Sequence, residues 1–280
     1  MARWERIRSR GRVEDRRGRG PAMAVGGLGG AGLVVFLLLV LLGGDPGDLG
    51  TLADQLQPAA PAGTATDEFA GRDAYEVFAA TVLGSANDTW RGFFAGSGLE
   101  YREPTLVLFR GRTDSACGGA TSAVGPHYCP LDETIYLDET FFDELQDRFG
   151  ARGGDVAEAY VIAHEVAHHV QHLTGTMDWI RDRQRANPAA ANELSVALEL
   201  QADCYAGVWA ASLDEGVLEP GEIAEALDAA AAVGDDRIQA RVQGQVNPET
   251  WTHGSSEQRV DWLERGYATA DPNACETFAP

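Results

Sequence analysis

Apolar positions recur at helical spacing over most of the chain beyond residue 71. Helical patterns cover 73–98, 140–150, 155–175, 187–216 and 220–234. Ser255 and Gln258 have the spacing of a capping box and predict the start of a last helix. Two short runs, 105–111 and 134–139, are rich in β-branched, aromatic and other apolar residues and predict strands. A small β-sheet beside a set of helices is an α+β arrangement.

One stretch near the N-terminus, 22–44, has no charged residue and ends in a dense Leu/Val run. About 20 apolar residues span a bilayer core, so this stretch predicts one N-terminal transmembrane helix, with a cleaved signal peptide as the alternative. Residues 1–21 hold eight arginines and three acids. The positive-inside rule therefore predicts a cytoplasmic tail. A flexible linker, 45–70, and one extracytoplasmic domain, 71–280, would follow in a single-pass protein of the cell membrane.

The formal net charge of −21 excludes a nucleic-acid partner, because phosphates are bound by basic surfaces. The four cysteines lie in the predicted extracytoplasmic part, where disulfides form. Three connectivities are possible, and the short loop between Cys117 and Cys129 favours those two as a pair, which leaves Cys204 for Cys275. A second zinc site made from Cys117, His127 and Cys129 is the alternative, although it lacks a fourth ligand.

The motif HEVAH places His164 and His168 four residues apart on a predicted helix, about 40° from each other around its axis. Two imidazoles then reach one ion at roughly 2.0 to 2.1 Å, the distance that zinc requires. Glu165 lies about 100° round from His164, where a carboxylate reaches a zinc-bound water rather than the ion. Glu165 is therefore the predicted general base, which activates that water for attack on a carbonyl.

The other histidines of this helix do not fit the same ion. His169 lies about 140° from His164, and His172 is about 12 Å along the axis, so we expect both on the surface or around the ligand shell. A third histidine six residues after His168 is excluded, because Thr174 stands there. The default third ligand is a carboxylate.

The downstream motif ELQAD offers Glu199 as that ligand, with Asp203 four residues later to hold a ligand histidine by its other ring nitrogen. Charged residues are rare in such an apolar helix unless they are paired or bind metal. Glu257 with Asp261 is the competing pair, but the helix dipole alone explains an acid at a helix start. Glu193 has no acid at the required spacing.

Two residues outside these motifs are candidates for stabilising an oxyanion. His253 precedes the last helix and could donate to the oxyanion of a tetrahedral intermediate, or it could be a turn histidine that stabilises the helix start. Tyr128 is a weaker candidate for the same role.

Taken in order, the segments ACGGATSAVGPHYCPLDETIYLDETFFDEL, HEVAHHVQHLTG, ELQADCYAGVW, DDRIQ and THGSSEQR resemble the bacterial neutral zinc metallopeptidase family over about residues 70–280. The resemblance implies a zincin-like helical domain and a membrane-anchored or exported protease. It also implies one Zn²⁺ ion held by His164, His168 and Glu199, with Glu165 as the base.

These observations predict a membrane-anchored zinc endopeptidase that hydrolyses extracytoplasmic proteins or peptides. A non-catalytic zinc-binding envelope scaffold is the alternative, and hydrolysis of a non-protein amide, such as a cell-wall crosslink, is a third. Glu165 favours an enzyme, because a structural zinc site needs no general base.

Overall fold

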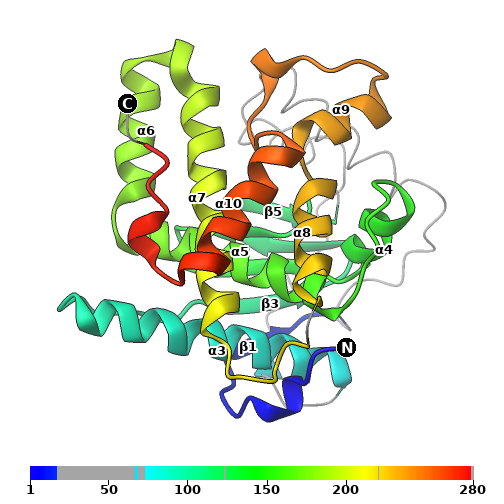
Figure 1. The fold of residues 1–280 in the computed structure, drawn as a ribbon, viewed down its shortest axis with the longest axis vertical. Helices are drawn as coiled ribbons and strands as arrows, with labels where there is room; N and C mark the ends of the chain where they lie inside the picture. Colours follow the sequence, from blue (N-terminus) through cyan, green and yellow to red (C-terminus); the bar gives the residue numbers. More distant parts are fainter. Residues whose placement is uncertain (18–66, 69–72, 123, 220, 279–280) are drawn as a thin grey trace.

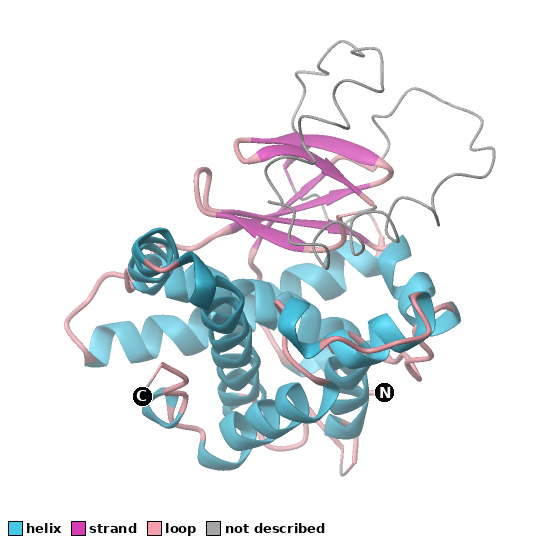
Figure 2. Cartoon of the chain, turned by 90° about the horizontal axis from the view of Figure 1, so that it is seen from above, coloured by secondary structure: helices cyan, strands magenta, loops and turns pink. Residues whose placement is uncertain are grey.

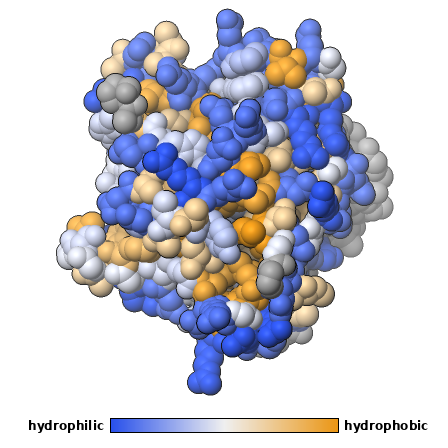
Figure 3. Space-filling view, in the orientation of Figure 1, coloured by the Kyte–Doolittle hydropathy of each residue, from blue (hydrophilic) through white to orange (hydrophobic). Residues whose placement is uncertain are grey.

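The computed structural model describes residues 1–17, 67–68, 73–122, 124–219 and 221–278. Its strands gather on one side of the molecule and most of its helices on the other, as Figure 2 shows. The predicted α+β class is confirmed. The surface in the view of Figure 3 is mostly hydrophilic, with a band of apolar residues down its middle.

A mixed sheet of five strands has the order β2-β1-β3-β7-β6. Its strands are β1 (Arg12–Asp15), β2 (Asp67–Glu68), β3 (Thr105–Phe109), β6 (His127–Cys129) and β7 (Thr134–Asp138). The strands β1, β3 and β7 are parallel, whereas β2 and β6 pair antiparallel at the edges. Strand β3 is covered on both faces, and its last four residues are buried and apolar rather than alternating with polar ones.

The two faces of β3 contact different partners. Leu106 and Leu108 belong to the main core with the helices. Val107 and Phe109 pack on the other face with Ala120 of a hairpin formed by β4 (Arg112–Ser115) and β5 (Gly118–Thr121).

Eight α-helices lie in the described part of the chain. They are α3 (Ala74–Gly96), α4 (Thr140–Asp147), α5 (Asp155–Leu173), α6 (Thr176–Ala186), α7 (Ala191–Ser212), α8 (Ile223–Ala232), α9 (Asp235–Val242) and α10 (Ser256–Thr269). The capping box of Ser255 and Gln258 is confirmed, and α5 stops before Gly175, whose φ of 78° is left-handed. Asp155 is the first residue of α5 rather than its cap, and its carboxylate binds the Ala2 amide and the Trp4 indole.

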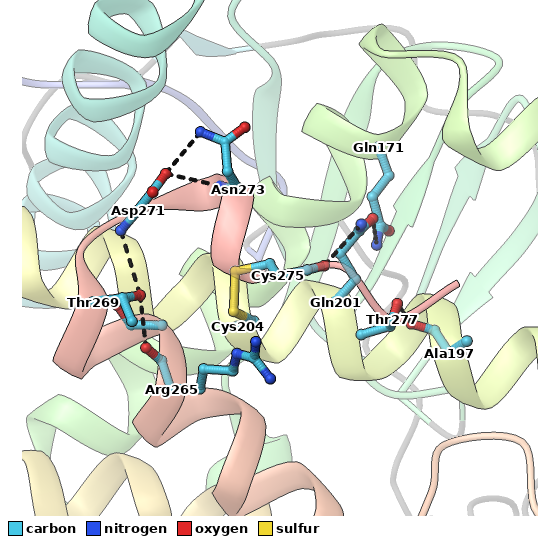
Figure 4. The surroundings of a disulfide bond; sticks show 11 residues. Gln171, Ala197, Gln201, Cys204, Arg265, Thr269, Asp271, Asn273, Cys275 and Thr277 are labelled. Carbon is cyan, nitrogen blue, oxygen red and sulfur yellow. Dashed lines mark hydrogen bonds between the residues drawn. A yellow bond between two sulfur atoms is a disulfide. The ribbon is translucent and has the colours of Figure 1, made fainter. Parts of the chain in front are cut away.

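Helices α7 and α10 pack with their backbones in close contact (Figure 1). A Cβ on Gly266 would lie 1.9 Å from the Cys204 carbonyl oxygen, and one on Gly207 would lie 2.2 Å from the carbonyl oxygen of Leu263. Only glycine permits this approach. The Cys204–Cys275 disulfide ties the C-terminal segment to the same side of α7 (Figure 4).

Both predicted disulfides, Cys117–Cys129 and Cys204–Cys275, are confirmed. The alternative zinc site is thereby excluded, because Cys117 and Cys129 bond to each other. His127 stacks on Tyr136 instead, with the ring centroids 5.4 Å apart.

The Arg-rich N-terminal segment is part of the domain, so its predicted separation as residues 1–21 is wrong. Strand β1 lies between β2 and β3, and Val13 is buried in the main core. Arg17 binds Glu139 and Asp73, each at 2.5 Å, so the basic segment meets the acidic remainder of the chain.

No helix within the described ranges has the length and apolar character needed to cross a bilayer. The predicted transmembrane helix, 22–44, lies outside those ranges, and so does the linker, 45–70, apart from the two residues of β2.

Candidate active site

The two histidines of HEVAH and the glutamate of ELQAD converge between α5 and α7. His164 Nε2 lies 3.2 Å from Glu199 Oε2, and His168 Nε2 lies 3.4 Å from Glu199 Oε1. One ligand atom from each of the three residues lies within 4.8 Å of the other two. Their positions follow from one helical turn in α5 and from the packing of α7 against it. The structure therefore joins the two predicted halves of the metal site.

A hydrogen bond orients each of these imidazoles from its other nitrogen. His164 Nδ1 donates to Asp203 Oδ1 at 2.9 Å, as the spacing of ELQAD predicts. His168 Nδ1 donates to Gln171 Oε1, also at 2.9 Å. A neutral imidazole that donates through Nδ1 presents the lone pair of Nε2 to the site. Two such nitrogens and one carboxylate are a ligand set that fits Zn²⁺ and leaves a fourth direction for water or substrate.

A buried network holds Asp203 in place. Arg259 of α10 donates to both of its carboxylate oxygens, at 2.8 and 2.9 Å, and the Tyr160 hydroxyl donates to Oδ1 at 2.5 Å. Burial opposes ionisation of Asp203, but Arg259 and His164 lower its pKa below the ordinary value. Burial likewise opposes protonation of His164, whereas the carboxylates of Asp203 and Glu199 raise its pKa to about 10. The protonated form of His164 is therefore favoured in the metal-free site, and Zn²⁺ would require the neutral form.

Glu165 lies beside the candidate metal ligands, and one of its carboxylate oxygens is unpartnered in the described part of the chain. Its side chain lines the same cavity as His164 and His168, and the residue is buried. Its Oε2 atom has no hydrogen-bond partner among the residues that the structure describes. An unsatisfied buried carboxylate oxygen is costly unless a water or substrate atom binds there.

His253 reaches the cavity from the turn before α10. Its Nδ1 lies 3.1 Å from Asp235 Oδ1, at the start of α9. Asp235 Oδ2 also accepts the backbone amides of Thr252 and His253, each at 2.7 Å, which fixes the turn. Burial opposes protonation of His253, but the Asp235 carboxylate raises its pKa above the ordinary 6.5. The pairing keeps the imidazole oriented and favours its cationic form.

His164, Glu165, His168, Glu199 and His253 line one cavity of about 370 Å³. That volume lies within the range of small-molecule and peptide sites. The cavity walls come from α4, α5, α7 and α9 and from the segments around Gly125 and His253. A peptide segment can therefore reach the ligand set, Glu165 and His253 at once.

Comparisons with known proteins agree with this geometry. A family model described as "Putative neutral zinc metallopeptidase" matches residues 2–278. The chain belongs to this family. The uncharacterized protein YpfJ of Escherichia coli K12 is 44% identical over 284 residues, which cover 99% of this chain and 98% of that protein. The uncharacterized protein Rv2575 of Mycobacterium tuberculosis H37Rv is 45% identical over 258 residues, 86% of this chain and 85% of its own length. No solved structure matches.

The region that matches the zinc metallopeptidase family extends further toward the N-terminus than the motifs indicated. The match begins at residue 2 and therefore includes β1, whereas the motifs carried the resemblance only from about residue 70. The N-terminal segment is thus part of what the family shares.

The remaining histidines of α5 lie outside the ligand set of this metallopeptidase. His169 is fully buried, accepts from the Tyr128 hydroxyl at 2.9 Å and donates to the Arg102 carbonyl at 2.5 Å, so a surface position for it is wrong. Burial lowers its pKa to about 4. His172 is half-buried, 3.8 Å from Glu133. Because the Tyr128 hydroxyl already donates its hydrogen to His169, it is a poor hydrogen-bond donor for an oxyanion.

Three residues of the metallopeptidase site were not found from the sequence: Arg259, Asp235 and Gln171. Gln171 is three residues after His168 on the same helix, so helical geometry alone could have indicated it. Arg259 lies on one face of α10 with Leu263 and Gly266, and a charge on that buried stripe was a usable signal. Asp235 had no such signal, because its contact with His253 is made by a turn.

Proposed function

We propose that this zinc metallopeptidase is an endopeptidase that hydrolyses peptide bonds of proteins outside the cytoplasm. The observation that carries the proposal is the buried, unpartnered carboxylate oxygen of Glu165 beside the converging nitrogens of His164 and His168. A site that only joined two helices would need no such group.

The chain's own residues divide the reaction between them. His164, His168 and Glu199 would hold one Zn²⁺, which, when bound, polarises the carbonyl and lowers the pKa of the attacking water. Glu165 takes a proton from that water and passes it to the leaving nitrogen. Asp203 and Gln171 keep the two imidazoles in position.

His253 is placed to stabilise charge on the carbonyl oxygen. It lines the cavity with Glu165, and Asp235 orients its ring. Donors aimed at developing negative charge typically contribute about a hundred- to a thousandfold in rate. We assign this role to His253.

We propose that the domain lies in an oxidising compartment. The described residues contain two disulfides and no free cysteine, which is typical of proteins in such compartments. Attachment to the membrane through the apolar segment 22–44 belongs to the proposal as well. Since β1 and β3 share a sheet, this attachment must leave both ends of the described chain on one side. Tags at both termini should then be digested by protease added to spheroplasts, whereas a single crossing would protect the N-terminal tag.

The decisive experiment compares Glu165→Gln with the parent, using the full chain because a fragment from residue 70 would lack β1. We expect Glu165→Gln to retain zinc and lose at least a thousandfold of the hydrolysis of a casein or peptide-library substrate. Glu158→Gln is the matched control, because this acid lies two turns earlier on α5 and does not line the cavity. Unchanged hydrolysis by Glu165→Gln would contradict the assignment of Glu165 as the general base.

A second variant separates metal binding from catalysis. Glu199→Ala should lose most of the zinc, measured by metal analysis after dialysis, together with the activity. Normal zinc content in Glu199→Ala would contradict the ligand assignment. If the protein binds zinc through all three ligands yet cleaves no peptide, the alternative of a non-catalytic zinc-binding scaffold is supported instead.

A further inference from the structure

Six apolar side chains of the active-site cavity come from neighbouring helices. They belong to α4 and the segment that follows it, to the N-terminal half of α5, and to the segment from the end of α8 into α9. We call this set the apolar pocket, formed by Phe141, Leu145, Phe149, Val161, Val233 and Ile238.

The pocket is firmly built. Leu145, Phe149, Val161 and Ile238 are buried members of the main core, and Phe141 and Val233 pack against it. Core side chains hold fixed positions, so the pocket keeps its shape and selects by size. A charged side chain placed there would lose its water and find no partner on these walls.

The pocket is adjacent to Glu165 on the same helix. Val161 precedes Glu165 by four residues, so both side chains lie on one face of α5, one turn apart. The ligand His168 is a further turn along that helix. The pocket therefore reaches Glu165 through Val161.

This adjacency indicates which half of the substrate enters the pocket. During hydrolysis, the water oxygen bonds to the carbonyl carbon, the carbon–nitrogen bond breaks, and one water proton reaches the leaving nitrogen through Glu165. The leaving nitrogen must lie within hydrogen-bond reach of Glu165 in that step. The residue that carries this nitrogen is then the one nearest to Val161.

We propose that the apolar pocket selects substrates with a large apolar residue immediately after the cleaved bond, so that the new amino terminus is Leu, Ile, Phe, Val or Met. This inference rests on the proposed peptidase function. Hydrophobic pockets discriminate by about ten- to two-hundredfold for each methylene-sized change in fit. The same walls reject Asp and Glu at this position, and the unpaired carboxylate of Glu165 adds to that rejection.

The test uses the zinc-loaded full chain and a set of quenched peptides that differ only in one central residue: Leu, Phe, Ala, Lys or Asp. We expect kcat/KM for Leu and Phe to exceed that for Ala by at least tenfold, with Asp the poorest. Mass spectrometry should find the cut immediately before the apolar residue. Equal rates for all five peptides, or cuts placed after the apolar residue, would overturn the pocket assignment.

A variant pair links this preference to the pocket. Val161→Phe fills the pocket and should move the preference from Leu and Phe to Ala, whereas Leu131→Asn, on a 73% exposed side chain that does not line the cavity, should leave it unchanged. An unaltered preference in Val161→Phe would contradict the proposal.

Binding provides a readout that does not depend on turnover. Titration of the Leu and Asp peptides into the zinc-loaded Glu165→Gln protein should give at least a tenfold tighter Kd for Leu. If Glu165-dependent cleavage occurs without preference, the pocket inference fails and the peptidase function stands. If no peptide is cleaved by the parent, both fail.

Discussion

Two His–Asp pairs face the same cavity and differ in almost everything else. The His164–Asp203 pair is buried, lies on two packed helices, and has Arg259 on both oxygens of the carboxylate. The His253–Asp235 pair lies at a turn, and the aspartate is held by backbone amides instead of a cation. The same two residue types thus serve a rigid metal site and a proton-bearing group whose charge can change.

The partner of the aspartate decides which role each pair can play. A buried carboxylate with a permanent guanidinium stays ionised and keeps its histidine in one orientation. The Asp235 carboxylate is held by backbone amides instead, and it raises the pKa of His253 without a guanidinium bound to the same carboxylate. This difference can be tested by breaking each pair separately.

The largest effect is expected for Asp203→Asn, which leaves Arg259 buried without its carboxylate. Breaking a buried ion pair by removing one partner costs about 3 to 5 kcal/mol, and loss of a supporting carboxylate weakens metal binding roughly ten- to a hundredfold. Denaturant unfolding and zinc competition with a chelator measure both changes. Asp182→Asn, in an exposed pair with Arg185, is the control and should have no measurable effect on either.

His253→Ala should affect catalysis without affecting the metal. We expect kcat/KM to fall by about a hundred- to a thousandfold, with zinc content and the free energy of unfolding nearly unchanged. Steady-state kinetics and metal analysis on the same preparation check this. Loss of zinc would show that His253 is a ligand and would end the contrast between the two pairs.

Asp235→Asn should change the pH profile. Protonated His253 is present below its raised pKa and is lost as the pH rises through it. Removing the Asp235 charge lowers that pKa, so the alkaline limb of kcat/KM moves to lower pH. The profile should be recorded well below the unfolding temperature, because Asp235 also accepts three backbone amides of the turn. If the alkaline limb of the kcat/KM profile does not move, His253 is not the group whose titration produces it.

The smallest effect is expected for His172→Gln, on a histidine that has no aspartate partner among the described residues. Its one ionic neighbour in the described part of the chain is Glu133, at 3.8 Å. Zinc content and peptidase activity should equal those of the parent, and the free energy of unfolding should change by less than about 0.5 kcal/mol. A tenfold loss of activity would show that the separation of ligand and non-ligand histidines on α5 is incomplete.

How much the sequence predicted depended on whether a contact is local. His164 and His168 share one helix, and Glu199 and Asp203 share another, so helical spacing alone placed each pair on one face and Glu165 beside the first pair. The two disulfides also followed from the short Cys117–Cys129 loop and the exclusion of alternatives. Residues whose partners are brought together by chain crossings, such as Asp235 and Arg259, were not predicted.

The N-terminal segment was misassigned because its signal is weak rather than absent. Only Val13 among the four residues of β1 is apolar, and a short strand with charged neighbours has too little pattern to be recognised. The positive charge suggested a cytoplasmic tail, whereas the arginines pair with acids contributed by the rest of the chain.

The position of β1 also determines when the fold can be completed. Strand β1 is synthesised before its partner β3, and Arg12 pairs with Thr105. The strand can therefore pair only after on the order of ninety further residues have been synthesised. Parallel pairing over such a separation forms slowly, and an unpaired strand remains exposed in the meantime. The five-stranded sheet therefore cannot close before β3 and β7 have followed β1.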